Sequence, residues 1–237
     1  MSDPFYTNKL YPFQDDVLSS IGSAATDLYL TGGTALSRVY LAHRYSDDLD
    51  LFINEDDQFK KRCNAVLDGL HDNSLKYEAT VASKRFLRIF AIKGTLNLKI
   101  DFVNDIAYRY GTPEISDIFP RVDNWRNILS NKLCALSRQE PKDYVDIAAI
   151  ACKFSFSWEE VVNEAGKKDV WAEPVAIARQ LSRIPAETMR SIRWRKPVDP
   201  EAIPELLDVI ARDVLQGDRN SVYGKELLAM GDRRSKG

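Results

Sequence analysis

Three aspartates stand in segments where the sequence predicts β-strands. Asp48 and Asp50 flank Leu49, and Asp101 occupies a polar position in the alternating run of residues 96–102. Successive strand side chains point to opposite faces, so Asp48 and Asp50 share a face and Asp101 points away from the apolar one. Strands disfavour aspartate, and gathered carboxylates repel each other unless a cation compensates. Oxygen-only ligands select a hard ion, Mg²⁺ or Mn²⁺; solvated positions on an open sheet face are the alternative interpretation.

A glycine pair precedes these aspartates. Gly32, Gly33 and Thr34 follow the short β-prone stretch 29–31 and open a helical pattern. Backbone N–H groups of such a turn can approach a phosphate closely, and a helix N-terminus favours the anion. A tight strand-to-helix turn is the alternative. Ser46, just before the first aspartate, is another candidate phosphate contact, with a loop-capping role as its alternative.

The order of these features has a chemical rationale. A glycine turn would hold a triphosphate, and metals held by the carboxylates would bridge it to an attacking hydroxyl. The third carboxylate, Asp101, would activate that hydroxyl or complete the metal site. Asp105 is a nearby competitor for this position, and Asp101 is preferred because it lies inside the alternating run.

The elements expected around these residues form an α+β protein. Strands are expected at 29–31, 48–53, 77–83, 85–92 and 95–103, with a helix at 58–70 and a hairpin turn at Lys93-Gly94. From about residue 124 the pattern is helical: 125–138, 142–153, 158–165, 171–181 and 203–215. Pro113 and Pro120 suggest the boundary, giving an α/β catalytic domain at 1–118 and a helical domain at 119–237.

Three segments resemble the AbiEii/AbiGii nucleotidyltransferase toxin family. They are Thr31–Leu36 continuing through His43–Phe52, then Leu129–Arg138, then Lys142–Asp146. The resemblance implies a polymerase-β-like nucleotidyltransferase domain followed by helices, and transfer of a nucleotide from an NTP to an acceptor such as a tRNA end. It also implies a toxin of a bacterial toxin–antitoxin or phage-defence pair, with a cognate antitoxin as partner.

The resemblance also assigns residues. Asp48 and Asp50 correspond to the metal-binding pair, with Asp101 as the acid on the later strand. Lys132 and Asp146 correspond to the family's other functional positions, and the second domain would contribute them to the site.

The sequence alone leaves Lys132 and Asp146 open. Lys132 borders the apolar stripe of the helix 125–138, where a lysine usually extends its ammonium to solvent. It could instead neutralise a triphosphate. Asp146 could form a weak surface bridge with Lys142, four residues away, or hold Lys132 in position. Arg44 is either a phosphate contact or a surface arginine.

The composition is that of an ordinary globular protein, with 44% hydrophobic and 29% charged residues and a net charge of −2. No apolar run approaches the roughly 18 residues of a membrane span, and the first ten residues lack a signal-peptide pattern. Cys63, Cys134 and Cys152 have no zinc-site spacing, so we expect buried reduced thiols, a cytoplasmic protein and no membrane partner.

A basic stretch lies in the C-terminal half of the chain, and two other functions compete with RNA modification. Arg179–Lys196 holds six basic residues, one acid and Trp194, a composition that suits RNA binding or a solvated helical face with the tryptophan in the core. One competing function is a nucleotidyltransferase that modifies a small molecule such as an antibiotic. The other is a catalytically silent nucleotide- or RNA-binding module, which would have no need of clustered carboxylates.

Overall fold

A computed structural model describes residues 3–24 and 26–227. The chain divides into two compact units. Unit 1 comprises Met1–Tyr40 and Tyr45–Asn124, and unit 2 comprises Leu41–Arg44 and Trp125–Gly237. Strands and helices mix in the chain as the predicted α+β class requires.

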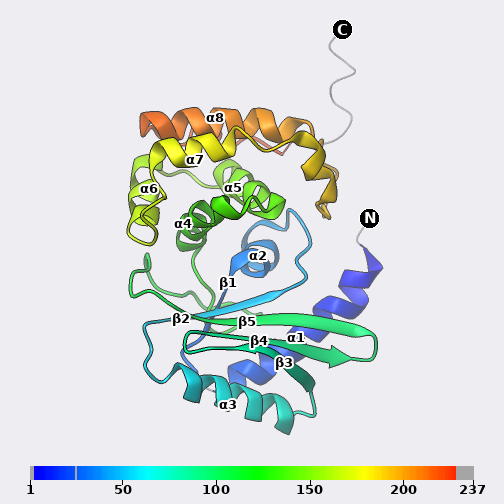
Figure 1. Cartoon of the computed structure of the whole chain (residues 1–237). Coiled ribbons are helices and arrows are strands. Elements are labelled where there is room, and N and C mark those ends of the chain that lie inside the picture. The colour runs from blue at the N-terminus through cyan, green and yellow to red at the C-terminus, as the bar shows by residue number, and fades with distance from the viewer. Residues whose placement is uncertain (1–2, 25, 228–237) are drawn as a thin grey trace. The chain divides into compact units, whose positions relative to one another are not determined.

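Unit 1 is built on a five-stranded mixed sheet (Figure 1). The strands are β1 (Tyr29–Thr31), β2 (Leu49–Asn54), β3 (Lys76–Ala82), β4 (Phe86–Lys93) and β5 (Leu96–Asp105). Their order is β1-β2-β5-β4-β3; β2 and β5 run parallel, and every other neighbouring pair is antiparallel. The sheet therefore places β5 between β2 and β4, so that residues from three strands share its centre.

Apolar and polar side chains alternate along β5, as predicted. Leu98, Ile100 and Phe102 are fully buried, and Lys99 and Asp101 occupy the other face. Two helices, α1 (Tyr11–Ser23) and α3 (Phe59–Asp72), pack against each other and lie along one face of the sheet (Figure 1). Helix α1 and the π-helical turn η1 (Tyr6–Leu10) before it were not predicted from the sequence.

Both predicted turns of unit 1 exist with small shifts. The helix after the glycines consists of α2 (Gly32–Ala35) and a π-helical continuation, η2 (Leu36–Leu41). Lys93 pairs with Leu96, so the β4–β5 hairpin turns at Gly94-Thr95, one residue later than predicted. Strand β2 begins at Leu49, and Asp48 immediately precedes it.

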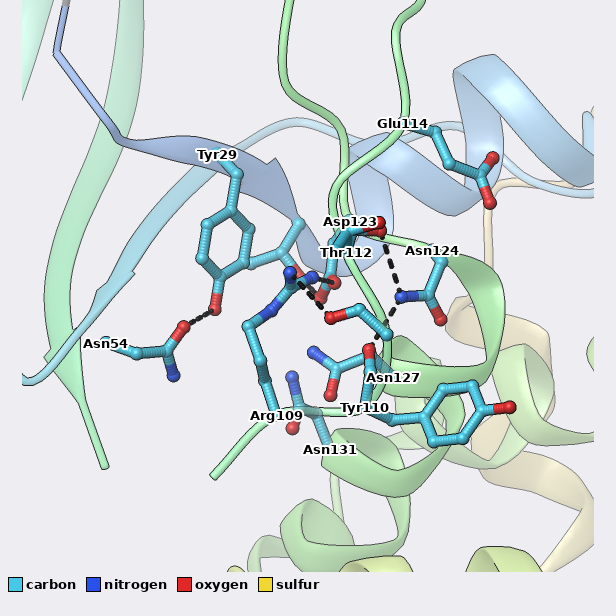
Figure 2. Close-up of polar contacts among 12 residues, drawn as sticks. Tyr29, Asn54, Arg109, Tyr110, Thr112, Glu114, Asp123, Asn124, Asn127 and Asn131 are labelled. Carbon is cyan, nitrogen blue, oxygen red and sulfur yellow. Dashed lines mark hydrogen bonds and ion pairs between the residues drawn. The ribbon is translucent and has the colours of Figure 1, made fainter. Parts of the chain in front are cut away.

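The chain segment before residue 125 fixes the end of β1 (Figure 2). The Leu30 N–H donates to the Arg121 carbonyl, and the Asp123 N–H donates to the Leu30 carbonyl, both at 2.8 Å. The buried Asp123 carboxylate accepts hydrogen bonds from the Thr31 hydroxyl at 2.8 Å and from Arg109 at 2.6 Å. These bonds fix Thr31, the residue from which the glycine turn starts.

Unit 2 is helical. Its elements are α4 (Trp125–Ala135), η3 (Leu136–Arg138), α5 (Pro141–Lys153), α6 (Trp158–Gly166), α7 (Pro174–Leu181), η4 (Ala186–Ser191) and α8 (Ala202–Gln216). Helix α5 is the most deeply buried of them, since every residue from Asp143 to Cys152 is buried. Helix α7 begins at Pro174, later than predicted, because proline lacks an N–H and suits the first helical turn.

The basic stretch 179–196 is not one helical face. It contains the end of α7, the 3₁₀ helix η4 and the connecting loops, and Trp194 forms an isolated backbone bridge with Arg44. Cys63 and Cys152 are buried and Cys134 is half-buried; all three are free thiols. No helix within residues 3–24 and 26–227 is long and apolar enough to cross a membrane.

Candidate active site

A row of polar residues crosses four neighbouring strands of unit 1. Register pairs Thr31 with Asp50, Asp50 with Asp101, and Asp101 with Arg88. Residues directly opposite each other on neighbouring strands have side chains on the same face, with strands about 4.8 Å apart. The row therefore places the carboxylates of Asp50 and Asp101 side by side, as the sequence-based hypothesis of a shared acidic face requires.

Two cations balance these carboxylates. Arg88 donates to both oxygens of Asp101, from Nε at 2.7 Å and from Nη2 at 2.8 Å. Lys99 Nζ lies 2.6 Å from Asp48 Oδ2 and 4.0 Å from Asp101 Oδ2. Burial alone would lower the pKa of Lys99, but its hydrogen bond to Asp48 and the charges of the three aspartates raise it above the ordinary value. The lysine therefore stays charged beside the aspartates.

The sequence-based hypothesis did not include Arg88 or Lys99. Lys99 was recognisable as a neighbour of Asp101, because both occupy the polar positions of the same alternating strand. Arg88 carried no such signal, since its pairing with Asp101 depends on the β4–β5 register.

The three carboxylates of Asp48, Asp50 and Asp101 are ligands of the kind that suits a hard divalent cation. Within the described residues, no group of three His, Cys, Asp or Glu side chains is arranged to hold a metal ion. Asp48 and Asp101 instead bind Lys99 and Arg88, and Asp50 shares its register with Asp101. A metal held by all three would have to draw Asp48 and Asp101 away from these cations.

Gly32 must be a glycine because Asp50 leaves no room for a side chain. Its φ is +67°, and a Cβ built on its backbone would lie 2.3 Å from Asp50 Oδ2. Close approach and positive φ are the two conditions under which glycine is required. The glycine turn and the acidic row are therefore in direct contact, as their proximity in the sequence suggested.

The other predicted nucleotide contacts have structural partners. The Thr34 hydroxyl donates a hydrogen bond to the backbone carbonyl of Asp48, which ties the glycine turn to the start of β2. Ser46 is buried, and its carbonyl accepts a hydrogen bond of 3.2 Å from Gln14 Nε2. Both residues thus help to fix the backbone around the aspartates.

A second charged cluster lies wholly within unit 2, around Asp146 on α5. The Asp146 side chain is fully buried, and Arg44 binds both of its oxygens, at 2.7 and 2.8 Å. Lys132 Nζ lies 2.7 Å from Asp146 Oδ2 and 2.7 Å from Asp143 Oδ1. His43 Nε2 lies 2.8 Å from Asp146 Oδ1.

These contacts decide between the alternatives of the sequence analysis. A surface bridge from Lys142 to Asp146 is wrong, because Asp146 is buried among Lys132, Arg44 and His43. Arg44 is likewise not a surface arginine, since its side chain is only 3% exposed. His43 belongs to the same cluster as Lys132.

The charges of this cluster shift the pKa values of its members. Burial would raise the pKa of Asp146, but Arg44 and Lys132 hold it well below its usual range. Burial would lower the pKa of Lys132, but Asp146 and Asp143 raise it. For His43 burial prevails over the favourable effect of Asp146, so its pKa is lowered and the imidazole is neutral at pH 7.

The sequence matches the model of the nucleotidyl transferase AbiEii toxin family, type IV toxin–antitoxin system, over residues 16–209. The chain belongs to the AbiEii nucleotidyltransferase toxin family. The match includes both units, and it makes the chain a nucleotidyltransferase and a toxin by family. No curated protein matches the sequence.

Solved structures share the AbiEii fold of this chain. JHP933 from Helicobacter pylori is 18% identical with a TM-score of 0.57, covering 88% of this chain and 93% of that one. MenT4, a nucleotidyltransferase toxin from Mycobacterium tuberculosis, is 14% identical with a TM-score of 0.57, covering 86% of this chain and 82% of that one. At these identities the likeness establishes the fold alone and does not identify the substrates of this AbiEii protein.

The contact between Gly32 and Asp50 predicts a specific defect. Gly32→Ala should lose roughly 1–2 kcal/mol of stability because of its positive φ, and it should also displace the Asp50 carboxylate and abolish transfer. Gly94→Ala is the matched control, since Gly94 has a φ of +60° and nothing within 4 Å of a built Cβ. Urea unfolding and transfer assays on both variants would test this; equal activities would show that the Asp50 contact is unimportant.

The lowered pKa of His43 predicts a pH-dependent stability. Below about pH 6.5 the unfolded chain binds a proton that folded His43 does not, so the free energy of unfolding should fall as the pH falls. His43→Gln should reduce this slope, whereas His71→Gln, at the exposed second histidine, should keep it. Urea unfolding between about pH 5 and 8 measures the slopes; an unchanged slope in His43→Gln would contradict the assignment.

Proposed function

We propose that this AbiEii protein transfers a nucleoside monophosphate from an NTP to an acceptor hydroxyl of RNA, in a reaction that depends on a divalent metal ion. The observation that supports the proposal is the register of Asp50 and Asp101 on neighbouring parallel strands, with Gly32 in contact with Asp50. A nucleotidyl transfer needs clustered carboxylates next to a backbone that accepts phosphates, and unit 1 offers both.

In the proposed reaction the acceptor oxygen forms a bond to the α-phosphorus, and the bond from that phosphorus to the pyrophosphate oxygen breaks. Asp48, Asp50 and Asp101 would hold Mg²⁺ or Mn²⁺, which when bound neutralises phosphate charge. The hydroxyl proton leaves with a carboxylate or with water, and Asp101 is the candidate base if it does not complete the metal site. The backbone of Gly32 and Gly33 would receive the triphosphate.

Arg88 and Lys99 would act as positioning residues. Their ion pairs hold Asp101 and Asp48 on one sheet face despite the repulsion between the carboxylates. In addition, a cation released from an aspartate by the metal could turn to the incoming phosphates, because lysine and arginine both bind phosphate well. Thr34 and Ser46 would contribute by fixing the backbone around the aspartates.

Lys132 and Asp146 are proposed as the functional residues of unit 2. Lys132 would supply positive charge to the nucleotide phosphates, and Asp146 would fix its position. The paired contacts of 2.7 Å to Asp143 and Asp146 support this role, because they hold the lysine in one geometry and keep it charged. We assign catalysis to unit 1 and this supporting role to unit 2, as the predicted domains 1–118 and 119–237 suggest.

The toxin's partners follow from the family. We propose a cognate antitoxin protein, a role in phage defence, and an RNA acceptor that resembles a tRNA end. The basic residues between Arg179 and Lys196 favour RNA over a small acceptor such as an antibiotic, since a basic segment provides the contacts that phosphodiesters need.

The acidic row predicts which variants lose transfer. Asp50→Asn and Asp101→Asn should each lower the rate by roughly 10²-fold or more, because metal and phosphate charge is no longer balanced. Asp105→Asn, at the far end of β5, is the matched control and should stay within a few-fold of the unchanged protein.

The measurement is incubation of each labelled NTP with total RNA or with an aminoglycoside, in Mg²⁺, Mn²⁺ or a chelator, followed by separation of the products. Labelled aminoglycoside products in place of labelled RNA would favour the small-molecule alternative. Loss of activity in Asp105→Asn with full activity in Asp101→Asn would transfer the role to Asp105.

Lys132 predicts a defect of a different kind. Lys132→Gln shortens the side chain by one atom, keeps an N–H donor and removes the charge, so transfer should fall by roughly 10²-fold. Lys142→Gln, the same change at an exposed position of α5, should leave the rate unchanged. Initial rates at saturating NTP, with folding monitored by circular dichroism, test this. A folded Lys132→Gln protein with a normal rate would restrict Lys132 to a structural role.

A further inference from the structure

A cavity of about 410 Å³ lies entirely within unit 2, near the Asp146 cluster. Its wall includes His43, the apolar residues Leu41, Ala149 and Val198, and, at its edge, several charged side chains. A volume of this size is within the range of small-ligand sites in proteins, about 300–1,000 Å³. The role proposed above for Lys132 and Asp146 does not use this cavity.

The charge around the cavity is positive. Lys153, Lys196 and Lys225 line it, and Glu226 is the one acid among the lining residues. All three lysines are exposed, and none forms an ion pair with a residue of the described chain. Lysines without ion pairs on a concave surface attract anions. A phosphate suits such a site, because its several oxygens can accept hydrogen bonds from more than one ammonium group.

His43 lines the cavity and has one ring nitrogen without a partner among the described residues. Its Nε2 faces the carboxylate of Asp146 and therefore carries the proton, so the Nδ1 of the neutral ring is a hydrogen-bond acceptor. The His43 side chain is 4% exposed, and its Nδ1 has no hydrogen-bond partner in the part of the chain that the structure describes. A buried acceptor without a partner is disfavoured, so a ligand that offers an N–H or O–H would complete it.

The structure places His43 next to the end of the basic stretch. The Arg195 N–H donates to the His43 carbonyl at 3.1 Å, so the chain around Lys196 is fixed beside the histidine. This contact joins the end of Arg179–Lys196 to the wall of the cavity, and it gives part of that stretch a defined place in a concave site.

We propose that this cavity binds a phosphorylated nucleoside, with the phosphate at the lysines and a hydroxyl or base N–H donating to His43 Nδ1. The apolar residues Leu41, Ala149 and Val198 would contact the flat base or the sugar. The inference rests on the proposed function, because a nucleotide transferred to RNA and the terminal nucleotide of the acceptor are both phosphorylated nucleosides. Free nucleotide and RNA end are the two sources to be distinguished.

The test is calorimetric titration with AMP, CMP, GMP and UMP, and with RNA trinucleotides bearing a 3′-hydroxyl or a 3′-phosphate. The protein carries Asp50→Asn and the buffer lacks divalent metal, so that the acidic row contributes little. The triple variant Lys153→Ala, Lys196→Ala, Lys225→Ala should weaken binding at least about tenfold and reduce its salt dependence. The control is Lys9→Ala, Lys61→Ala, Lys142→Ala, which removes the same charge at exposed positions that do not line the cavity.

Ala149→Leu is a second variant that fills the cavity without changing its charge. Tight binding of trinucleotides with weak binding of monophosphates identifies an RNA end, and the reverse identifies a free nucleotide. Absence of binding, or equal losses in the two triple variants, would overturn the inference. If the protein transfers nucleotides but the cavity binds none of these ligands, the inference alone is refuted. If the cavity binds them but the protein transfers no nucleotide, the proposed function alone is refuted.

Discussion

Electrostatic repulsion between carboxylates on one sheet face is the constraint on which the structure of unit 1 depends. Asp50 and Asp101 cannot separate, because the parallel register of β2 and β5 makes them neighbours. The surrounding residues balance this repulsion. Arg88 on β4 pairs with Asp101, and Lys99 pairs with Asp48. Even the glycine turn follows from this constraint, because Asp50 occupies the space that a side chain at position 32 would need. A protein that required only a stable sheet would place apolar residues or threonines in this row.

The Asp146 cluster presents the same problem in unit 2 in a more buried form. Burying an ion pair costs desolvation free energy, and hydrophobic residues of similar volume often stabilise a protein as well or better. A buried ion pair is therefore weak evidence of stabilisation. Asp146 is fully buried and is contacted by Lys132, Arg44 and His43. Burying this charged group costs desolvation free energy. Such a cost is understandable if the arrangement serves to hold Lys132 charged and in place, because perturbed titratable groups concentrate at functional sites.

The sequence predicted the local elements better than their pairing. Alternation along 96–102 identified the face of Asp101, and the acidic pair at 48 and 50 was recognised from its spacing. The pairing of Arg88 with Asp101 was not predictable, since it requires knowing how β4 and β5 align. Helix α1 was missed although Phe13, Val17 and Ile21 recur at helical spacing and are buried, because the polar residues between them obscured the stripe.

Contacts between distant segments were the least predictable part. His43 and Arg44 meet Asp146 about a hundred positions later in the chain, and no local pattern indicates such a pairing. The family resemblance identified Lys132 and Asp146 but gave no reason for their proximity to these two residues. Because His43 contacts Asp146 through one nitrogen and lines the cavity, a donor that binds its other nitrogen would favour the neutral tautomer already selected by Asp146. His43 therefore belongs both to the wall of the cavity and to the charged cluster in which Asp146 contacts Lys132.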